Sequence, residues 1–228
     1  MFYFDWTMLL VLPGLLLGLW AQHRVNSAFS EYSRVHSRRG VRAEEVSAEL
    51  LRRSGNDDVS ITGVAGNLTD HYDPSSNTLR LSQSVLGSTS IAAIGVAAHE
   101  CGHAMQQHDG YLPLKLRSAI VPVVNIGSHL YFPIFMAGIL FSWEPLIYVG
   151  ILCFALTLLF SLVTLPVEFD ASRRAVSMLQ SGGYLSEDEL SGARKVLNAA
   201  AMTYVSAVVS SLLQLLRLLL IARSRSDD

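Results

Sequence analysis

The sequence is short of charge. Only 16% of its 228 residues are Asp, Glu, Lys or Arg, whereas soluble domains average about 25%. The formal net charge is -2, so there is no basic excess that could follow the phosphates of a nucleic acid. Half of the residues are hydrophobic, which is far too many for a disordered chain. A nucleic-acid binder and a disordered protein are therefore excluded.

Cysteine is also scarce, with only Cys101 and Cys153 in the chain. Cys153 lies inside an apolar run, and Cys101 lies inside a motif typical of metal sites. A disulfide between them is not expected, so the sequence is not a secreted disulfide scaffold.

The missing charge is concentrated rather than spread evenly. Asp, Glu, Lys and Arg are absent from residues 6–22, 118–143, 145–167 and 196–216. The rest of the chain carries every charge and has an ordinary globular composition. The pattern predicts a hydrophilic region inserted among membrane segments.

Two of these runs are read as membrane spans. A span needs about 20 mostly apolar residues, and residues 147–166 are the clearest case. Residues 6–22 are shorter, but Trp6 and Trp20 suit the two membrane interfaces. No basic residue precedes this run and no cleavage site follows it, so we read it as an uncleaved anchor.

The other two runs leave alternatives open. Residues 120–141 are either a kinked span or one arm of an interfacial hairpin, and a short link makes them antiparallel to the next span. Their interruptions are Pro122, Asn125, His129 and Pro133. Residues 199–222 include Gln214 and Arg217, so they form either a fourth span or an amphipathic surface helix.

The orientation follows from basic residues near the ends of the spans. They flank the hydrophilic side of the first three runs and are absent from the link at residues 142–145. They are Arg24, Arg34, Arg38, Arg39, Arg42, Lys115, Arg117, Arg173 and Arg174. The large hydrophilic region is therefore expected in the cytoplasm and the N-terminus outside.

Local patterns predict the elements of the hydrophilic parts. Helices are expected at residues 43–53, 85–107 and 167–180, and strands at residues 59–64 and 78–81. Gly55 is placed to end the first helix, and Ser186 with Glu189 forms a capping box. The expected organisation is an anchor (1–22), a hydrophilic region (23–117), a helical hairpin (118–166), further helices (167–198) and a last helix (199–228).

One motif carries chemistry. Residues 99–103 read His-Glu-Cys-Gly-His. On a helix, positions four apart lie on one face, so His99 and His103 can reach the same ion. Glu100 then lies beside that ion as the base for a zinc-bound water. The motif predicts a zinc site.

A catalytic zinc site needs a third protein ligand. His71 and His129 are isolated and read as ordinary polar histidines, and His108 faces away from His103 on a continued helix. Asp109 could serve as the third ligand only if the chain turned back at a glycine, but position 106 is Gln106.

Glu168 is the better candidate for the third ligand. It follows the uncharged run at residues 145–167, and Ala171, Ser172 and Ala175 share its helix face. Small residues let a second helix approach the motif closely. The alternative is that Glu168 binds no metal and is only a charged residue at the end of the apolar run. His99, His103 and Glu168 would hold one Zn²⁺ per chain.

These residues carry a resemblance to a family. The stretches AAHECGHAMQ, LPVEFDASRRA and DHYDPSSNTLRLS, with the anchor, resemble the neutral zinc metallopeptidases of bacterial membranes, called YugP-like. The resemblance covers nearly the whole chain. It implies a mainly α membrane protein with a small β-hairpin and a gluzincin-like core, flanked by three to four transmembrane or interfacial helices. It also implies a multi-pass protein of the bacterial inner membrane.

A more distant similarity extends to the HtpX-type and CAAX-prenyl endopeptidases. Their third ligand opens a Glu-aromatic-x-Ala-Asp segment, which aligns with residues 168–172 and places the ligand on Glu168. Ser172 replaces the aspartate that would orient a histidine, so Asp170 or Ser172 is expected in that role. Site-2-type intramembrane proteases are also similar. Here polar residues follow the motif and no Leu-Asp-Gly segment exists, which favours an active site at the membrane surface.

The function expected from the sequence is zinc-dependent endopeptidase activity with Glu100 as general base. The candidate oxyanion donors are Tyr204, Arg173 and Tyr184. The expected partners are a peptide or protein substrate, which includes membrane proteins, and the lipid bilayer, with no nucleic acid. Residues 78–82 could bind an extended substrate by strand addition or form a purely structural hairpin.

Two other functions are alternatives to a peptidase. The first is a non-catalytic zinc-binding scaffold or chaperone-like regulator, which has no need of Glu100. The second is a transporter, which is disfavoured because the apolar runs contain no Asp, Glu or Lys.

Overall fold

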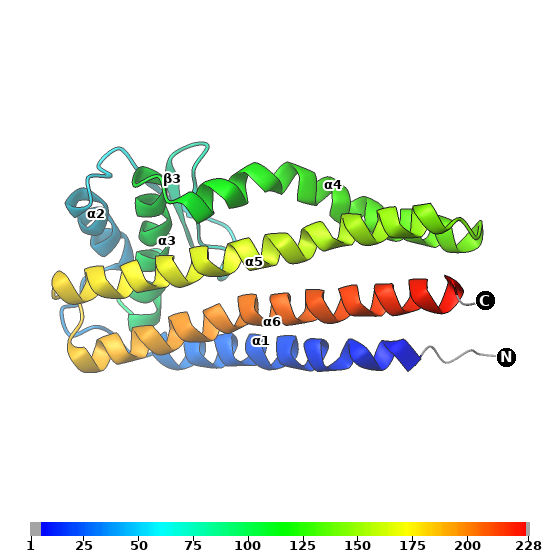
Figure 1. Ribbon diagram of the computed structural model, residues 1–228. Helices are drawn as coiled ribbons and strands as arrows, with labels where there is room; N and C mark the ends of the chain where they lie inside the picture. Colours follow the sequence, from blue (N-terminus) through cyan, green and yellow to red (C-terminus); the bar gives the residue numbers. More distant parts are fainter. Residues whose placement is uncertain (1–5, 227–228) are drawn as a thin grey trace. The chain divides into compact units, whose positions relative to one another are not determined.

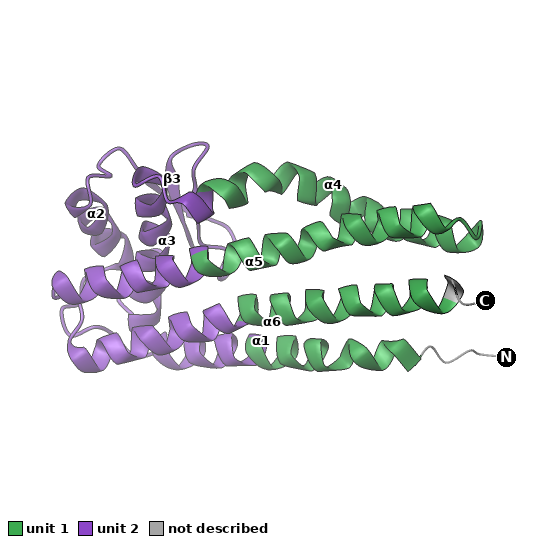
Figure 2. Ribbon diagram, in the orientation of Figure 1, with its two compact units in different colours: residues 1–21, 115–166, 203–228 green, residues 22–114, 167–202 purple. Residues whose placement is uncertain are grey.

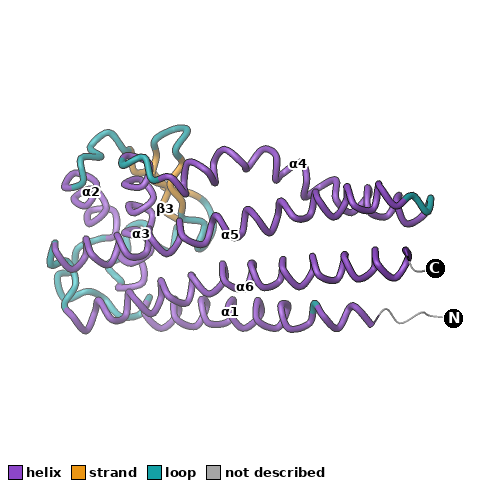
Figure 3. Tube along the Cα trace, viewed as in Figure 1, coloured by secondary structure: helices purple, strands orange, loops and turns teal. Residues whose placement is uncertain are grey.

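A computed structural model describes residues 6–226 of the chain. The fold is mainly helical, with one small sheet (Figures 1 and 3). The helices are η1 (Trp6–Leu10), α1 (Leu12–Tyr32), α2 (Ala43–Arg53), α3 (Ile91–His108), α4 (Leu112–Leu140), α5 (Glu144–Ser181) and α6 (Glu187–Ser226). The strands are β1 (Ser60–Val64), β2 (His71–Asp73) and β3 (Thr78–Ser82).

The chain forms two compact units, coloured separately in Figure 2. Unit 1 comprises residues 1–21, 115–166 and 203–228, and unit 2 comprises residues 22–114 and 167–202. Helices α1, α4, α5 and α6 each contribute to both.

Unit 1 is built from long apolar helices that pack through small residues. Gly150 lies against Phe135, so that a Cβ at Gly150 would stand 2.8 Å from the Phe135 backbone nitrogen. One hydrophobic cluster of this unit is formed by the buried side chains of Phe135, Ile147, Ile151, Phe154, Leu218 and Ala222. Many large apolar side chains elsewhere in this unit remain exposed in the absence of lipid.

Unit 2 has an ordinary hydrophobic core. Helix α3 packs against α2 and contacts β2 and β3. The largest fully buried apolar side chains are Leu50, Leu79, Leu81, Ile94, Leu179 and Leu190. Helix α3 is alanine-rich and buries most of its length, which lets its neighbours approach closely.

The sheet has three strands in the order β1-β3-β2. Strand β2 pairs antiparallel with β3, which gives the expected hairpin, and β1 pairs parallel with β3 from Ser60↔Thr78 to Val64↔Ser82. The central strand β3 is therefore paired on both sides and cannot accept a further strand. Of the two readings left open for residues 78–82, the sheet therefore agrees with a structural hairpin and not with strand addition at β3, and the outer strands are β1 and β2.

Two helices begin or extend differently from the expectation. Helix α3 starts at Ile91 rather than at residue 85, because the Ser90 side chain caps it by accepting from the Ala93 amide. Helix α5 runs without a break from Glu144 to Ser181, with Pro166 inside it. The span expected at residues 147–166 and the helix expected at 167–180 are therefore one continuous helix, although the boundary between the two units also falls after Pro166.

Helix α2 ends where the sequence predicts. Helix α2 matches the expected residues, and Gly55 adopts φ 74° just beyond it, as a glycine that ends a helix does. Helix α1 ends at Tyr32.

Four helices are long and apolar enough to cross a membrane by length and composition. They cover Trp6–Tyr32, Leu112–Leu140, Glu144–Ser181 and Glu187–Ser224 within the described chain. Of the readings left open by the sequence, these lengths favour spans for the second and fourth apolar runs.

Candidate metal centre

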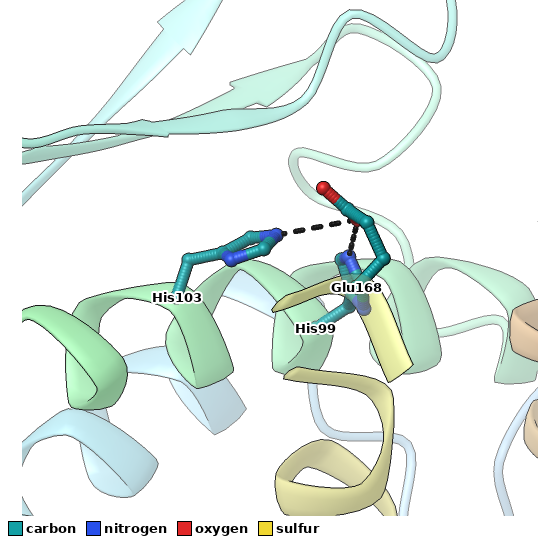
Figure 4. A group of neighbouring side chains, drawn as sticks. All are labelled: His99, His103 and Glu168. Atoms are coloured by element: carbon teal, nitrogen blue, oxygen red, sulfur yellow. Dashed lines mark hydrogen bonds and ion pairs between the residues drawn. The ribbon is translucent and has the colours of Figure 1, made fainter. Parts of the chain in front are cut away.

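Three side chains of unit 2 converge on one point. His99 and His103 project from the same face of α3, and Glu168 reaches them from α5 (Figure 4). The Glu168 Oε2 atom lies 3.3 Å from His99 Nε2 and 3.6 Å from His103 Nε2. One donor atom from each residue lies within 4.8 Å of the other two. These are the donor types and the spacing that one small metal ion needs.

The close approach of α5 to α3 depends on small residues. An added Cβ at Gly102 would stand 2.6 Å from the backbone oxygen of Ala171, so any side chain there would push the helices apart. Ala171 and Ala175 are fully buried on the facing side of α5. Glu168 stands one turn before Ala171, which explains why its carboxylate reaches the two histidines.

The imidazole of His103 is oriented by Gln106. The Gln106 amide nitrogen donates to Val167 O at 2.8 Å and to Asp170 Oδ2 at 3.0 Å, and both of these atoms are acceptors only. Its Oε1 atom must therefore face His103 Nδ1, 3.0 Å away. Nδ1 consequently carries the hydrogen, and the Nε2 lone pair is left for an ion.

His99 has a different outer partner. The Ser172 hydroxyl lies 3.1 Å from His99 Nδ1, so it can accept a hydrogen bond from that nitrogen. Each histidine thus presents Nε2 to the cluster and has its second nitrogen occupied, as metal-binding histidines usually do. Asp170 acts behind Gln106 and does not contact a ring directly.

Glu100 is held beside the cluster by a backbone amide. Its Oε2 atom accepts a hydrogen bond of 3.0 Å from the amide nitrogen of Tyr72, on strand β2. Burial raises the pKa of Glu100, the nearby histidines oppose this, and the Glu168 and Asp70 carboxylates add to it. A raised pKa suits a carboxylate that takes and returns a proton near neutral pH.

The electrostatics of His103 follow from the same neighbours. Burial disfavours its charged form, but the neighbouring Glu168 and Glu100 carboxylates outweigh this and raise the pKa of His103. Negative charge therefore dominates the pocket that the three ligand atoms share, which favours a cation there.

A polar network continues behind Gln106. Arg174 Nε donates to Asp170 Oδ2 at 2.7 Å, and its Nη1 atom bonds Asp109 at the end of α3. This ties the C-terminal end of α3 to α5 one turn beyond Asp170. Asp109 is thus engaged with Arg174, and it is not part of the cluster.

The other candidates raised by the sequence lie elsewhere. His71 is exposed on β2 and bonds Thr69 O, and His129 lies on α4 in unit 1 and bonds Asn125 O. The guanidinium of Arg53 lies 5.6 Å from the centre of the Tyr184 ring, and Tyr184 follows α5, whose end is about 20 Å along the helix from Glu168. Of the remaining candidates, Tyr204 lies on α6 in unit 1, and Arg173 lies on α5 with its guanidinium 3.7 Å from Asp170.

Sequence reasoning missed two groups at this site. Gln106 stands three residues after His103 on a helix, so its position on the same face was readable from the spacing. The Tyr72 amide could not be predicted from the sequence, because almost any residue type supplies a backbone N–H.

The residues fit zinc. Two imidazole nitrogens and one carboxylate oxygen converge, both outer ring nitrogens are occupied, and a further carboxylate stands beside the cluster. This donor set is typical of hydrolytic zinc enzymes.

The comparisons with known proteins agree with this class. Residues 7–223 match a family described as "Putative neutral zinc metallopeptidase". The chain is 43% identical over 219 residues to the "Putative membrane protease YugP" of Bacillus subtilis (strain 168), which covers 96% of this chain and 97% of that protein. No solved structure matches the chain.

The donor set and the family match define the zinc-metallopeptidase class, and four helices of the described residues are long and apolar enough to cross a membrane. The chain belongs to the neutral zinc metallopeptidase family that contains YugP. The family resemblance read from the sequence is thereby confirmed.

Proposed function

We propose that this protein is a membrane-bound zinc endopeptidase in which His99, His103 and Glu168 hold one zinc ion. The observation that carries the proposal is the convergence of two Nε2 atoms and one Oε2 atom within 4.8 Å, with Glu100 held beside them. A bound zinc ion supplies a polarised water whose pKa is lowered to about 7.

Glu100 is the general base of this proposal. Its buried carboxylate takes a proton from the attacking water and returns it to the leaving amine. The Tyr72 amide keeps one oxygen in place, so the other oxygen is directed to the proton. Gln106 and Ser172 fix the planes of the two imidazoles. A purely structural zinc site has no use for Glu100, which disfavours the scaffold alternative.

Strand β2 is the part of the sheet that suits an extended substrate. It forms one edge of the sheet, contacts α3 and carries the amide that binds Glu100. A peptide that pairs with this edge would bring its scissile bond near the base.

The first experiment tests catalysis with Glu100→Gln, which preserves the shape of the side chain. The purified full chain in detergent is loaded with zinc, and hydrolysis of fluorescein-labelled casein is followed together with zinc content by mass spectrometry. The wild type and the exposed control Glu31→Gln should cleave casein and lose activity with a chelator. Glu100→Gln should retain one zinc and lose at least about a hundredfold in rate.

The results separate the alternatives. If Glu100→Gln cleaves casein as fast as the wild type, Glu100 is not the general base. If the wild type binds zinc tightly but neither cleaves casein nor processes itself, the scaffold function replaces the peptidase.

We also propose that unit 2 faces the cytoplasm of a bacterial cell. Basic residues flank the hydrophilic side of the first three apolar runs, and the link at residues 142–145 has none. In a background without native cysteines, Asp57→Cys should react with an impermeant maleimide only after lysis. Trp143→Cys should react in intact cells lacking the outer membrane, and the reverse pattern would contradict the orientation.

A further inference from the structure

A basic pocket lies between α5 and α6 within unit 2. Its volume is about 240 Å³, and it is lined by Phe169, Ser172, Arg173, Arg194, Leu197 and Asn198, among others. The lining residues that the structure describes include two arginines and no Asp or Glu. The pocket is therefore positively charged over an apolar floor.

The two guanidinium groups are only loosely engaged. Arg173 is 76% exposed and lies 3.7 Å from Asp170, whose carboxylate is held more closely by Arg174 and Gln106. Arg194 donates to the Gln180 side chain at a long 3.4 Å. Guanidinium groups bind a phosphate through short paired hydrogen bonds, and these arginines can exchange long contacts for such bonds.

The position of the pocket along the sequence indicates its surroundings. Phe169 and Arg173 follow directly on the uncharged run that ends at residue 167, and Leu197 and Asn198 lie at the start of the run that begins at residue 196. Such boundaries between apolar and charged sequence lie at the membrane interface. Phe169 is 42% exposed.

We propose that this pocket binds the phosphate of an anionic phospholipid. Arg173 and Arg194 bind the phosphate, Asn198 bonds the glycerol oxygens, and Phe169 and Leu197 contact the first carbons of the acyl chains. Basic pockets between helices at the cytoplasmic side of a membrane favour such headgroups. The volume is below the roughly 300–1,000 Å³ of sites that enclose whole ligands, so the pocket holds the headgroup and leaves the chains in the bilayer.

The lipid site adjoins the metal cluster. Ser172 lines the pocket, and its hydroxyl bonds His99 Nδ1 at 3.1 Å. The same residue, Ser172, therefore lines the lipid pocket and orients the imidazole of His99. The proposal does not depend on peptidase activity, because lipid binding can be measured on the inactive protein.

The test uses native mass spectrometry of the full chain, released from nanodiscs of phosphatidylcholine with or without phosphatidylglycerol. The wild type should retain one phosphatidylglycerol in preference to phosphatidylcholine. Arg173→Gln and Arg194→Gln should each weaken retention about fivefold, and the double variant should weaken it more. Arg34→Gln removes the same charge from an exposed residue outside the pocket and should retain lipid normally.

Several results would overturn the proposal. These are equal retention of the two lipids, unchanged retention in the double variant, or an equal loss in Arg34→Gln. Inorganic phosphate is added in a separate arm. If it displaces phosphatidylglycerol completely at millimolar concentration, the pocket is a free-phosphate site instead. Zinc content of each variant confirms its fold, and the single variants remain informative if the double variant is unstable.

Discussion

The Oε1 atom of Gln106 lies 3.0 Å from Nδ1 of His103, and the same side chain donates two hydrogen bonds to α5. Gln106 is completely buried. It therefore couples the orientation of an α3 histidine to the helix that carries Glu168. This contact explains how two helices can present their donor atoms to one point.

Replacing Gln106 with methionine should weaken zinc binding. The change keeps the length of the side chain but removes the acceptor for His103 and the donor to α5. Affinity measured against a competing chelator should fall by about 10- to 100-fold, which is typical when an outer partner of a metal-binding histidine is lost. Gln107→Met is the matched control, because Gln107 is adjacent and exposed. Wild-type affinity in Gln106→Met would exclude this role.

A side chain at position 102 should separate the two helices. Gly102→Ala places a Cβ 2.6 Å from the Ala171 backbone oxygen, whereas Gly95→Ala places one 3.3 Å from the Ala193 Cβ. Overpacking of this kind costs about 1–3 kcal/mol, which exceeds the roughly 1 kcal/mol that alanine gains in a helix. The midpoint temperature of thermal unfolding, measured on the zinc-free protein, should therefore fall clearly in Gly102→Ala and change less in Gly95→Ala. The opposite order would show that the helices can move apart without cost.

The turn between β2 and β3 should be sensitive to acid. Hydrogen bonds from Ser75 and Ser76 lower the pKa of Asp73. A lowered pKa means that the carboxylate stabilises the turn above its unfolded pKa of about 3.9, and that this stabilisation is lost as the pH falls through the lower folded value. Asp73→Asn should therefore speed local amide exchange at neutral pH.

Hydrogen–deuterium exchange of the β2–β3 hairpin gives the measurement, with rates corrected for the intrinsic effect of pH. The difference between wild type and Asp73→Asn should shrink as the pH falls well below 3.9. Asp57→Asn, at an exposed carboxylate before β1, should have little effect on the hairpin. A difference that persisted unchanged at low pH would contradict the assigned role of Asp73.

The thiol of Cys101 should be unreactive in the folded protein. It is completely buried, its Sγ atom faces the Ser47 carbonyl oxygen, and burial raises its pKa to about 12. In a Cys153→Ser background, a maleimide at pH 8 should label Cys101 only after unfolding, because the thiolate is the reactive form. Asp57→Cys gives an exposed control that should react at once. Rapid labelling of folded Cys101 would show that α3 opens locally.

Much of the cluster was readable from the sequence because it depends on local spacing. The four-residue separation of His99 and His103 defines one helix face, and Glu168 was found from the end of an uncharged run followed by small residues. The structure brings these three side chains together. The position of Tyr72 depends on a hairpin returning to α3, which involves contacts distant in sequence.

The features of the fold that the sequence did not reveal also have physical causes. Strands β1 and β3 pair in parallel, and parallel strands are not connected by a tight turn. The sequence therefore contains no turn motif from which this pairing could be predicted. Three consecutive hydroxyl residues, from Ser88 to Ser90, could each cap α3, and only Ser90 has the required contact. The change from uncharged to charged sequence after residue 167 marks a change of surroundings and not a helix end, so α5 continues through it.

The outer partners of the two histidines are both uncharged. Ser172 offers a hydroxyl and Gln106 an amide, and the nearest carboxylate behind them, Asp170, is reached only through Gln106. Carboxylate partners make imidazole ligands more basic. Neutral partners leave the imidazoles weaker electron donors, so a bound ion would retain more of its Lewis acidity for the carbonyl oxygen of a substrate.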